Sequence, residues 1–463
     1  GMLGVRTSPT SSSSTLLTEK DNYVILEPGY YYLSTTADGC DHSYVKSYKP
    51  IKIQGDVTIC LNGNQIQKAG STTGPVFEVP SDCTLTLTDC KVTGQIVCND
   101  SSNGSGVYVN GGTLNLYSGQ ITQSYGQKGT DSNKYGGGVY VGAGGTFSMY
   151  GGVITENSAN YGGGVYVKSG TFNMDGGTIK SNTSSGGYGT LSFGGAGVYV
   201  EASGNFIMNN TASVTENKIG YGSTGGAGVY VNGGTFEMHN DASVADNTVN
   251  NINGSSGGGV YVNGGTFEMH NSASVTGNKA TNGTLNGGGV YVNGSGTFAM
   301  NNSASVSGNT ANQGGGVYVE SGTFNMNDGK ISGNKAKNDK ASNDTNGGGV
   351  FVNKSGTFNM NDGAITGNTA TNTAERNTTY GGGVYVSGGT FTMNGGTSSV
   401  SKNTAKNGGG VSVSSGTFNM NDGTISGNTG NGVFVNGGTF TVSNTPTVTG
   451  NKDASDTASN VFL

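Results

Sequence analysis

A four-residue pattern, Gly-Val-Tyr-Val with small variations, recurs twelve times along the chain. Successive copies begin 22 to 34 residues apart. Self-similarity at such a period is typical of solenoid proteins, in which each repeat forms one coil that stacks on its neighbours. The first valines of the twelve copies are Val107, Val139, Val165, Val198, Val229, Val260, Val290, Val317, Val350, Val384, Val411 and Val433.

Each repeat combines a constant part with one variable loop. A Phe-x-Met segment follows Val-Tyr-Val, and an x-(Ile/Val)-x-x-Asn segment comes next. The gap from this asparagine to the next Val-Tyr-Val varies from 5 to 16 residues, so nearly all insertions fall there. Ser124 stands at the asparagine position in the first repeat, and the other repeats have Asn157, Asn182, Asn217, Asn247, Asn278, Asn309, Asn334, Asn368, Asn403, Asn428 and Asn451.

The three segments of a repeat have the pattern of short β-strands. Val-Tyr-Val and Phe-x-Met alternate in a way that places their flanking apolar residues on one face. Gly-Gly and Asn-Gly pairs between them supply the positive φ that tight turns need. A β-propeller blade needs four strands in about 40 to 45 residues, which a 22-residue repeat cannot hold. We therefore predict an all-β fold, a right-handed single-stranded parallel β-helix with about twelve regular coils and two or three N-terminal coils.

The composition changes near residue 100. Only nine of the 88 glycines, but all five cysteines, lie in residues 1–100. We predict a flexible lead-in at 1–19, an N-terminal cap with atypical first coils at 20–103, and regular repeats at 104–463. An odd number of cysteines cannot pair completely within one chain. The sequence is compatible with two disulfides and equally with buried free thiols. The closing SNVFL reads as the start of a strand and predicts that the natural protein continues past Leu463.

Charge and hydropathy exclude several classes of function. The net charge is −6 and only Arg6 and Arg376 are arginines, which argues against nucleic-acid binding. A run of 18 apolar residues is absent, so we expect no membrane insertion. The Gly-rich runs lack the Lys-Ser/Thr of a phosphate loop, and we expect no cofactor.

The repeat resembles the repeat of a known protein family. Gly-Gly-Gly-Val at 136–139, GGAGV at 194–198 and 225–229, and Phe-x-x-Asn in later repeats are similar to the polymorphic outer-membrane protein repeat. The likeness spans about residues 104–451 and implies a right-handed parallel β-helix on a bacterial surface protein, often adhesin-like. DVTICLNGNQI followed by CTLTLTDC is similar to the entry coils of pectate-lyase-like β-helix proteins.

The aromatic residue of each Val-Tyr-Val segment should point away from the core and form a stripe. An exposed stripe could stack on sugar rings or pack against a partner protein. The alternative is that the rings stabilise the strand face by stacking on one another. The candidate binding residues are Tyr108, Tyr140, Tyr166, Tyr199, Tyr230, Tyr261, Tyr291, Tyr318, Phe351 and Tyr385.

Other repeated polar positions favour structural roles. We expect the asparagines to form a ladder that satisfies turn backbone. Asp328, Asp362 and Asp422 lie in Asn-Asp-Gly turns that lack the calcium-binding nonapeptide pattern. Adjacent repeats carry two glutamate–histidine pairs, Glu237 with His239 and Glu268 with His270. A divalent metal could bind between the two histidines. A recent duplication of the repeat also explains the pairing, and we predict no metal.

The pattern favours a secreted or cell-surface β-helix that acts as an adhesin-like binding or stalk module without catalysis. Its expected partners are glycans or host and cell-surface proteins, bound by the aromatic stripe or by the variable loops at 125–136, 184–194, 336–347 and 370–380. The alternative is a carbohydrate-active enzyme, a polysaccharide lyase or glycoside hydrolase of the parallel β-helix type. Scattered acidic residues and the lack of singular residues argue against it, because catalysis needs paired carboxylates or a comparable cluster.

Overall fold

The computed structural model describes residues 5–6, 18–20, 23–33, 44–69, 73–98, 104–128, 133–184, 194–220, 225–250, 257–281, 285–338, 345–372, 378–453 and 455–463. These residues contain strands and no helix, and nearly all strand pairs are parallel. They form a β-solenoid of about 13 turns, which confirms the predicted fold class. Most of the predicted lead-in, Cys40 and the centres of the four variable loops lie outside the described residues.

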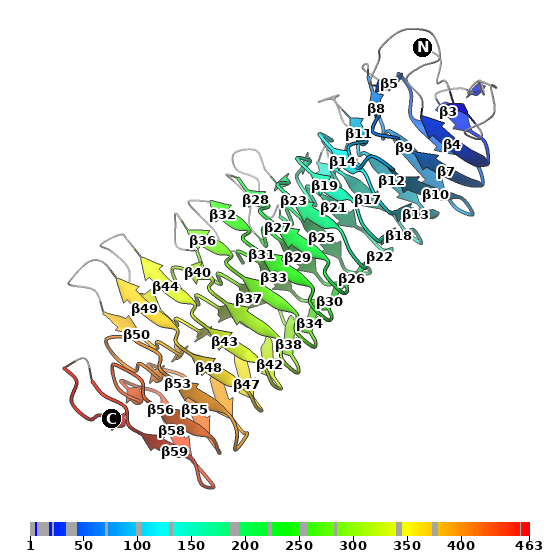
Figure 1. Cartoon of the computed structure of the whole chain (residues 1–463). Coiled ribbons are helices and arrows are strands. Elements are labelled where there is room, and N and C mark those ends of the chain that lie inside the picture. Colours follow the sequence, from blue (N-terminus) through cyan, green and yellow to red (C-terminus); the bar gives the residue numbers. More distant parts are fainter. Residues whose placement is uncertain are drawn as a thin grey trace. The chain divides into compact units, whose positions relative to one another are not determined.

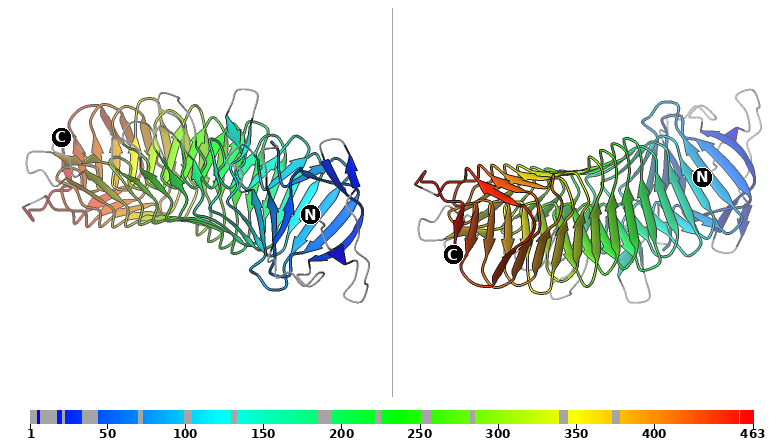
Figure 2. Two further views of the ribbon diagram at one scale, coloured as in Figure 1. Left: turned by 90° about the horizontal axis from the view of Figure 1, so that it is seen from above. Right: turned by 90° about the horizontal axis from the view of Figure 1, so that it is seen from below.

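The chain divides into two compact units, which we describe separately. The first contains Gly1–Gly186 and Phe193–Lys218, and the second contains Gly187–Ser192 and Ile219–Leu463. In each unit the strands build three sheets, and successive coils add one parallel strand to each sheet; among the described strands only β1 and β2 of the first unit join these sheets antiparallel (Figures 1 and 2). We name these sheets the Phe-Met sheet, the Val-Tyr-Val sheet and the third sheet.

The first unit begins with the atypical coils and continues into the regular repeats. Its Phe-Met sheet contains β1 (Val5–Arg6), β4 (Gly29–Leu33), β7 (Asp56–Cys60), β10 (Thr84–Thr88), β13 (Thr113–Leu116), β18 (Thr146–Met149), β22 (Thr171–Met174) and β26 (Asn205–Met208). Its Val-Tyr-Val sheet contains β2 (Thr18–Lys20), β3 (Tyr23–Leu26), β6 (Ile51–Ile53), β9 (Phe77–Pro80), β12 (Val107–Asn110), β17 (Val139–Val141), β21 (Val165–Val167) and β25 (Val198–Glu201). Its third sheet contains β5 (Tyr44–Ser47), β8 (Gln65–Lys68), β11 (Gln95–Cys98), β14 (Gln120–Thr122), β19 (Val153–Thr155), β23 (Thr178–Lys180) and β27 (Ser213–Thr215).

The second unit contains only regular repeats. Its Phe-Met sheet contains β30 (Thr235–Met238), β34 (Thr266–Met269), β38 (Thr297–Met300), β42 (Thr323–Met326), β47 (Thr357–Met360), β52 (Thr390–Met393), β55 (Thr417–Met420) and β58 (Thr439–Val442). Its Val-Tyr-Val sheet contains β29 (Val229–Asn232), β33 (Val260–Asn263), β37 (Val290–Asn293), β41 (Val317–Val319), β46 (Val350–Val352), β51 (Val384–Val386), β54 (Val411–Val413), β57 (Val433–Val435) and β60 (Val461–Phe462). Its third sheet contains β31 (Ser243–Ala245), β35 (Ser274–Thr276), β39 (Ser305–Ser307), β43 (Lys330–Ser332), β48 (Ala364–Thr366), β53 (Ser399–Ser401), β56 (Thr424–Ser426) and β59 (Thr447–Thr449).

Identical residues of neighbouring coils meet in register and fill the core. In the second unit Phe236 of β30 pairs with Phe267 of β34, and their ring centroids lie 4.8 Å apart. The corresponding rings of the first unit, Phe147 and Phe172, lie 4.5 Å apart. The Phe and Met side chains of the Phe-x-Met strands from β18 to β55 are fully buried, as the alternation predicts. Each large buried side chain stabilises the fold by about 1.5 to 3 kcal/mol before entropy is subtracted.

Sequence reasoning missed a fourth, very short strand in many coils. It directly follows the ladder asparagine and places one side chain inside, most often alanine, as Ala280 and Ala311 do. Short strands of this set are β20 (Ser158–Ala159) and β24 (Thr183–Ser184) in the first unit, and β32 (Thr248–Asn250), β36 (Lys279–Thr281), β40 (Thr310–Ala311), β44 (Lys335–Asn338) and β49 (Thr369–Asn372) in the second. β28 (Lys218–Ile219) belongs to the same set. The variable loops contribute two further strand pairs. One is antiparallel, β15 (Gln127–Lys128) with β16 (Lys134–Tyr135), and the other is parallel, β45 (Thr345–Asn346) with β50 (Thr379–Tyr380).

Candidate functional site

The aromatic stripe is stacked as predicted, but most of it is not exposed. From Tyr166 to Tyr385 the stripe residues are only 0 to 8 % exposed, and Tyr108 and Tyr140 are half-buried. The prediction of a solvent-facing stripe is therefore wrong for eight of its ten residues: Tyr166, Tyr199, Tyr230, Tyr261, Tyr291, Tyr318, Phe351 and Tyr385.

The glycine run before each Val-Tyr-Val strand gives the physical reason. The rings do face away from the core, but the chain turns back over them. A Cβ on Gly287, whose φ is +69°, would lie 2.9 Å from the Cβ of Tyr291, so only glycine fits this close approach. In the first unit a second aromatic residue adds to the cover, since the Tyr161 ring lies 5.2 Å from that of Tyr199.

Burial raises the pKa values of five stripe tyrosines: Tyr108, Tyr140, Tyr166, Tyr261 and Tyr318. Burial, with Tyr108 and Glu201 as further causes, raises the pKa of Tyr140 from 10.0 to about 12. Burial also raises the pKa of Tyr318 to about 12, although a hydrogen bond from Asn353 opposes the shift. Tyr166 and Tyr291 donate hydrogen bonds to Glu201 and Glu320, so the stripe is satisfied internally.

We expect these tyrosines to make the fold sensitive to alkali. Because the folded pKa is raised, the stabilisation is complete below the unfolded pKa of about 10 and is lost as the pH rises from about 10 to about 12. Unfolding midpoints measured across this interval should fall. Tyr318→Phe, which copies Phe351 of the next coil, should show a shallower fall. Ionisation of every tyrosine near pH 10 in an ultraviolet titration would contradict the expectation.

The asparagine ladder has the structural role that the sequence predicts. In the second unit the amide N–H and the Nδ2 of Asn278 both donate to Oδ1 of Asn309, at 2.9 and 3.0 Å. Asn309 repeats both contacts with Asn334, and its Nδ2 also donates to the carbonyl oxygen of Val275. These side chains are 0 % exposed, so they bind backbone and one another. The Asn-Asp-Gly turns are structural too, because Asp328 accepts the amide of Gly329.

A partly exposed column of side chains follows the Phe-x-Met strands, and sequence reasoning recognised only parts of it, namely the two histidines and the asparagine of the Phe-x-x-Asn motif. We call it the post-Met column. In the first unit Tyr117 and Tyr150 stack with ring centroids 4.7 Å apart and are 51 % and 45 % exposed. Asp175 then accepts a hydrogen bond from Asn209 at 2.9 Å. The sequence did contain a signal for this column, because the residue after the methionine varies in chemical type among the repeats, whereas the Phe and Met themselves are nearly constant.

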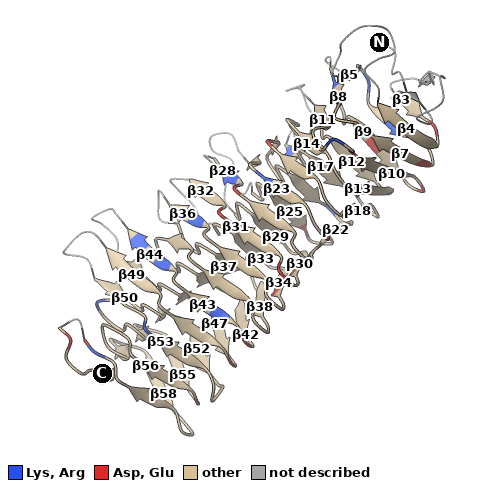
Figure 3. Cartoon of the chain, viewed as in Figure 1, with Lys and Arg blue, Asp and Glu red and all other residues tan. Residues whose placement is uncertain are grey.

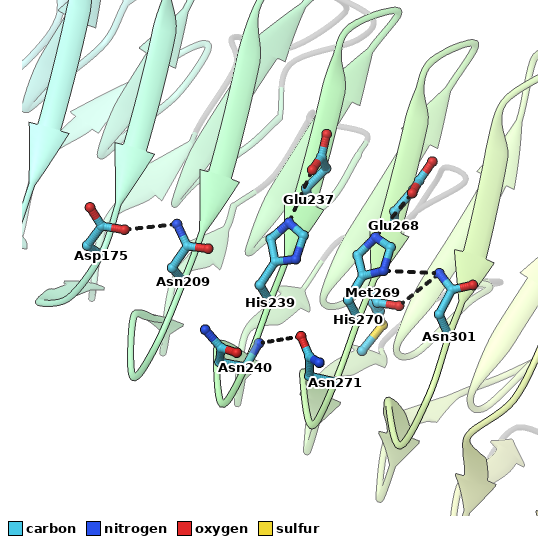
Figure 4. A network of polar contacts seen from close by, with 10 residues as sticks. All are labelled: Asp175, Asn209, Glu237, His239, Asn240, Glu268, Met269, His270, Asn271 and Asn301. Atoms are coloured by element: carbon cyan, nitrogen blue, oxygen red, sulfur yellow. Dashed lines mark hydrogen bonds and ion pairs between the residues drawn. The ribbon is translucent and has the colours of Figure 1, made fainter.

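In the second unit the post-Met column begins with two histidines and continues with amides. The His239 and His270 rings stack with centroids 4.7 Å apart, and each Nε2 lies 3.1 Å from its own glutamate, Glu237 or Glu268 (Figure 4). Hydrogen bonds of 2.9 to 3.0 Å then join Asn301, Asn327, Asn361, Asn394, Asn421 and Ser443 in sequence.

We expect no zinc binding at the two histidines. Stacked rings 4.7 Å apart hold their nitrogens side by side rather than converging on one ion. Among the described residues, no group of three or more His, Cys, Asp or Glu side chains is placed to hold a metal. Calorimetry with zinc should give no heat above the buffer control. A heat that disappears in His239→Asn with His270→Asn, which copies Asn301, would contradict this.

Comparison with protein-family models, curated proteins and solved structures finds no match to this chain. The site must therefore be judged on its own chemistry. Charged residues are scattered along the described strands rather than gathered in one place (Figure 3). No helix long and apolar enough to cross a membrane occurs in the part of the chain that the structure describes.

Proposed function

We propose that this chain is an adhesin-like binding or stalk module of a secreted or cell-surface protein and that it performs no catalysis. The observation that carries the proposal is the contrast between the buried side chains of the coils and the partly exposed side chains of the post-Met column. Inward positions repeat the same residue coil after coil, whereas the post-Met column has paired tyrosines, an acid–amide pair and paired imidazoles before it settles into a run of asparagines. Variation confined to exposed side chains on a constant scaffold is typical of recognition surfaces.

The partners we propose are glycans or cell-surface proteins. Exposed tyrosine beside a carboxylate and an amide offers both apolar contact and hydrogen bonding, which suits either partner. The likeness of the repeat to the polymorphic outer-membrane protein repeat, and of the first coils to pectate-lyase-like β-helices, supports a bacterial surface location.

A binding screen with matched variants tests the proposal. The wild-type chain is applied to a glycan array and to immobilised cell-surface proteins, together with a column variant carrying Tyr117→Asn, Tyr150→Asn and Asp175→Asn. We expect this variant to bind at least about tenfold more weakly. Lys168→Asn with Lys180→Asn changes two exposed lysines elsewhere in the same unit and should bind like wild type.

Two results would overturn parts of the proposal. Equal binding by the column variant and the lysine variant would remove the post-Met column as the binding surface, and absence of wild-type binding would reject the adhesin role. Release of new sugar ends from plant or host polysaccharides would reject the non-catalytic assignment and favour the carbohydrate-active alternative.

A further inference from the structure

Two thiols of neighbouring N-terminal coils face each other. Cys60 ends β7, and Cys90 lies in the turn that follows β10. Their Sγ atoms are 3.6 Å apart, and the Cys90 thiol also donates toward Oδ1 of Asn62 at 3.4 Å. Cys90 is exposed and Cys60 is half-buried, so a small solute can reach the pair.

The sheet register holds this pair together. β7 and β10 pair in parallel, with Thr88 opposite Cys60, so Cys90 follows the residue opposite Cys60 by two positions. Cys60 alternates with the buried Val57 and Ile59 and therefore lies on the outer face of the strand. A sulfur–sulfur bond of about 2 Å requires the two Sγ atoms to approach from the 3.6 Å that now separates them.

We infer that Cys60 and Cys90 form a disulfide that links two adjacent coils of the N-terminal cap when the chain meets a small-molecule disulfide oxidant. The exposed Cys90 thiolate attacks one sulfur of the oxidant and releases one thiol, which leaves a mixed disulfide. The Cys60 thiolate then attacks the Cys90 sulfur and releases the second thiol. Two protein thiols lose two electrons and two protons, and the oxidant is reduced to two thiols.

The remaining described cysteines are placed differently. Cys98 is fully buried on the inner face of β11, where an oxidant cannot reach it. The Cys83 sulfur accepts the amide of Gly55 at 3.3 Å. The inference concerns the covalent state of the cap and is independent of the proposed binding role.

Peptide mapping of the full chain tests the inference. The folded protein is incubated with oxidised glutathione, free thiols are then alkylated in denaturant so that buried Cys98 also reacts, and the chain is cut with trypsin and with a protease that cleaves before aspartate. Cleavage before Asp82 and Asp89 places Cys83 and Cys90 on separate peptides. We expect residues 56–68 linked to 89–91, and alkylation of three of the five cysteines.

Matched variants decide the outcome. Cys83→Ser should still give the 56–68 to 89–91 link, whereas Cys90→Ser should leave Cys60 alkylated, and circular dichroism should confirm that both variants fold. Linkage of Cys60 or Cys90 to Cys40 or Cys83 would overturn the inference, as would full alkylation of both thiols after oxidation.

Discussion

Replacing Asn309 by alanine is expected to lower the free energy of unfolding by about 3 to 5 kcal/mol. The substitution removes the acceptor for two Asn278 donors and the donor for the Val275 carbonyl. These groups are buried, so water cannot replace the lost partners. Each buried group left unsatisfied costs about 1 to 3 kcal/mol.

Asn327→Ala is the matched control for this prediction. Asn327 also belongs to an amide ladder, and its Nδ2 donates to Asn301 at 2.9 Å, but its side chain is exposed. Water can therefore satisfy both groups, and we expect a loss of about 0.5 kcal/mol. The measurement is chemical denaturation of the full chain. Equal shifts for Asn309→Ala and Asn327→Ala would show that burial does not set the strength of the ladder.

Tyr291→Ser is expected to destabilise the second unit by about 3 kcal/mol. The ring is fully buried and stacks on Tyr261 and Tyr318 at 4.8 and 5.0 Å, and its hydroxyl donates to Glu320. Serine is compatible with the strand, since Ser412 occupies the equivalent position of β54. The loss therefore reports the missing ring rather than a poor strand residue.

The contrast with an exposed ring separates packing from recognition. Tyr117→Ser removes a ring that is 51 % exposed and should cost no more than about 1 kcal/mol. We expect Tyr291→Ser to change binding only where it unfolds the chain. A Tyr291→Ser protein that keeps wild-type stability but loses a glycan or protein partner would restore the aromatic stripe as a binding surface.

The coil architecture could be predicted because its determinants are local. Alternation within Phe-x-Met and constant spacing to the asparagine decide which side chains meet, and Phe236 does meet Phe267. The fourth strand was missed because its inward signal is a single small residue such as Ala280. The burial of Tyr291 was missed because the glycine run that precedes its strand, beginning at Gly287, packs against it, and alternation within a strand carries no information about what lies above it.

The candidate site was harder to predict than the fold. The post-Met residues of the first unit, such as Tyr150 and Asp175, differ between coils, so a search for repeated motifs passes over them, whereas the later asparagines do repeat as Phe-x-x-Asn. The two histidines drew attention because they repeat, yet their rings lie parallel instead of converging. The thiol pair was left open because the number of cysteines does not specify which strands are neighbours, and only the β7–β10 register does so.

The near-identity of adjacent coils has a consequence for how such a chain can evolve. Residues 228–240 and 259–271 have the same sequence, and Asn247 presents the same hydrogen-bonding groups as Asn278. Removing residues 248–278 would bring Asn247 to the place of Asn278 beside Asn309. Unequal recombination between such segments can therefore add or delete a whole coil, and the asparagine of each remaining coil still hydrogen-bonds to an equivalent asparagine in the next coil. The number of coils can thus change by inheritance without a change in the residues that pair neighbouring coils.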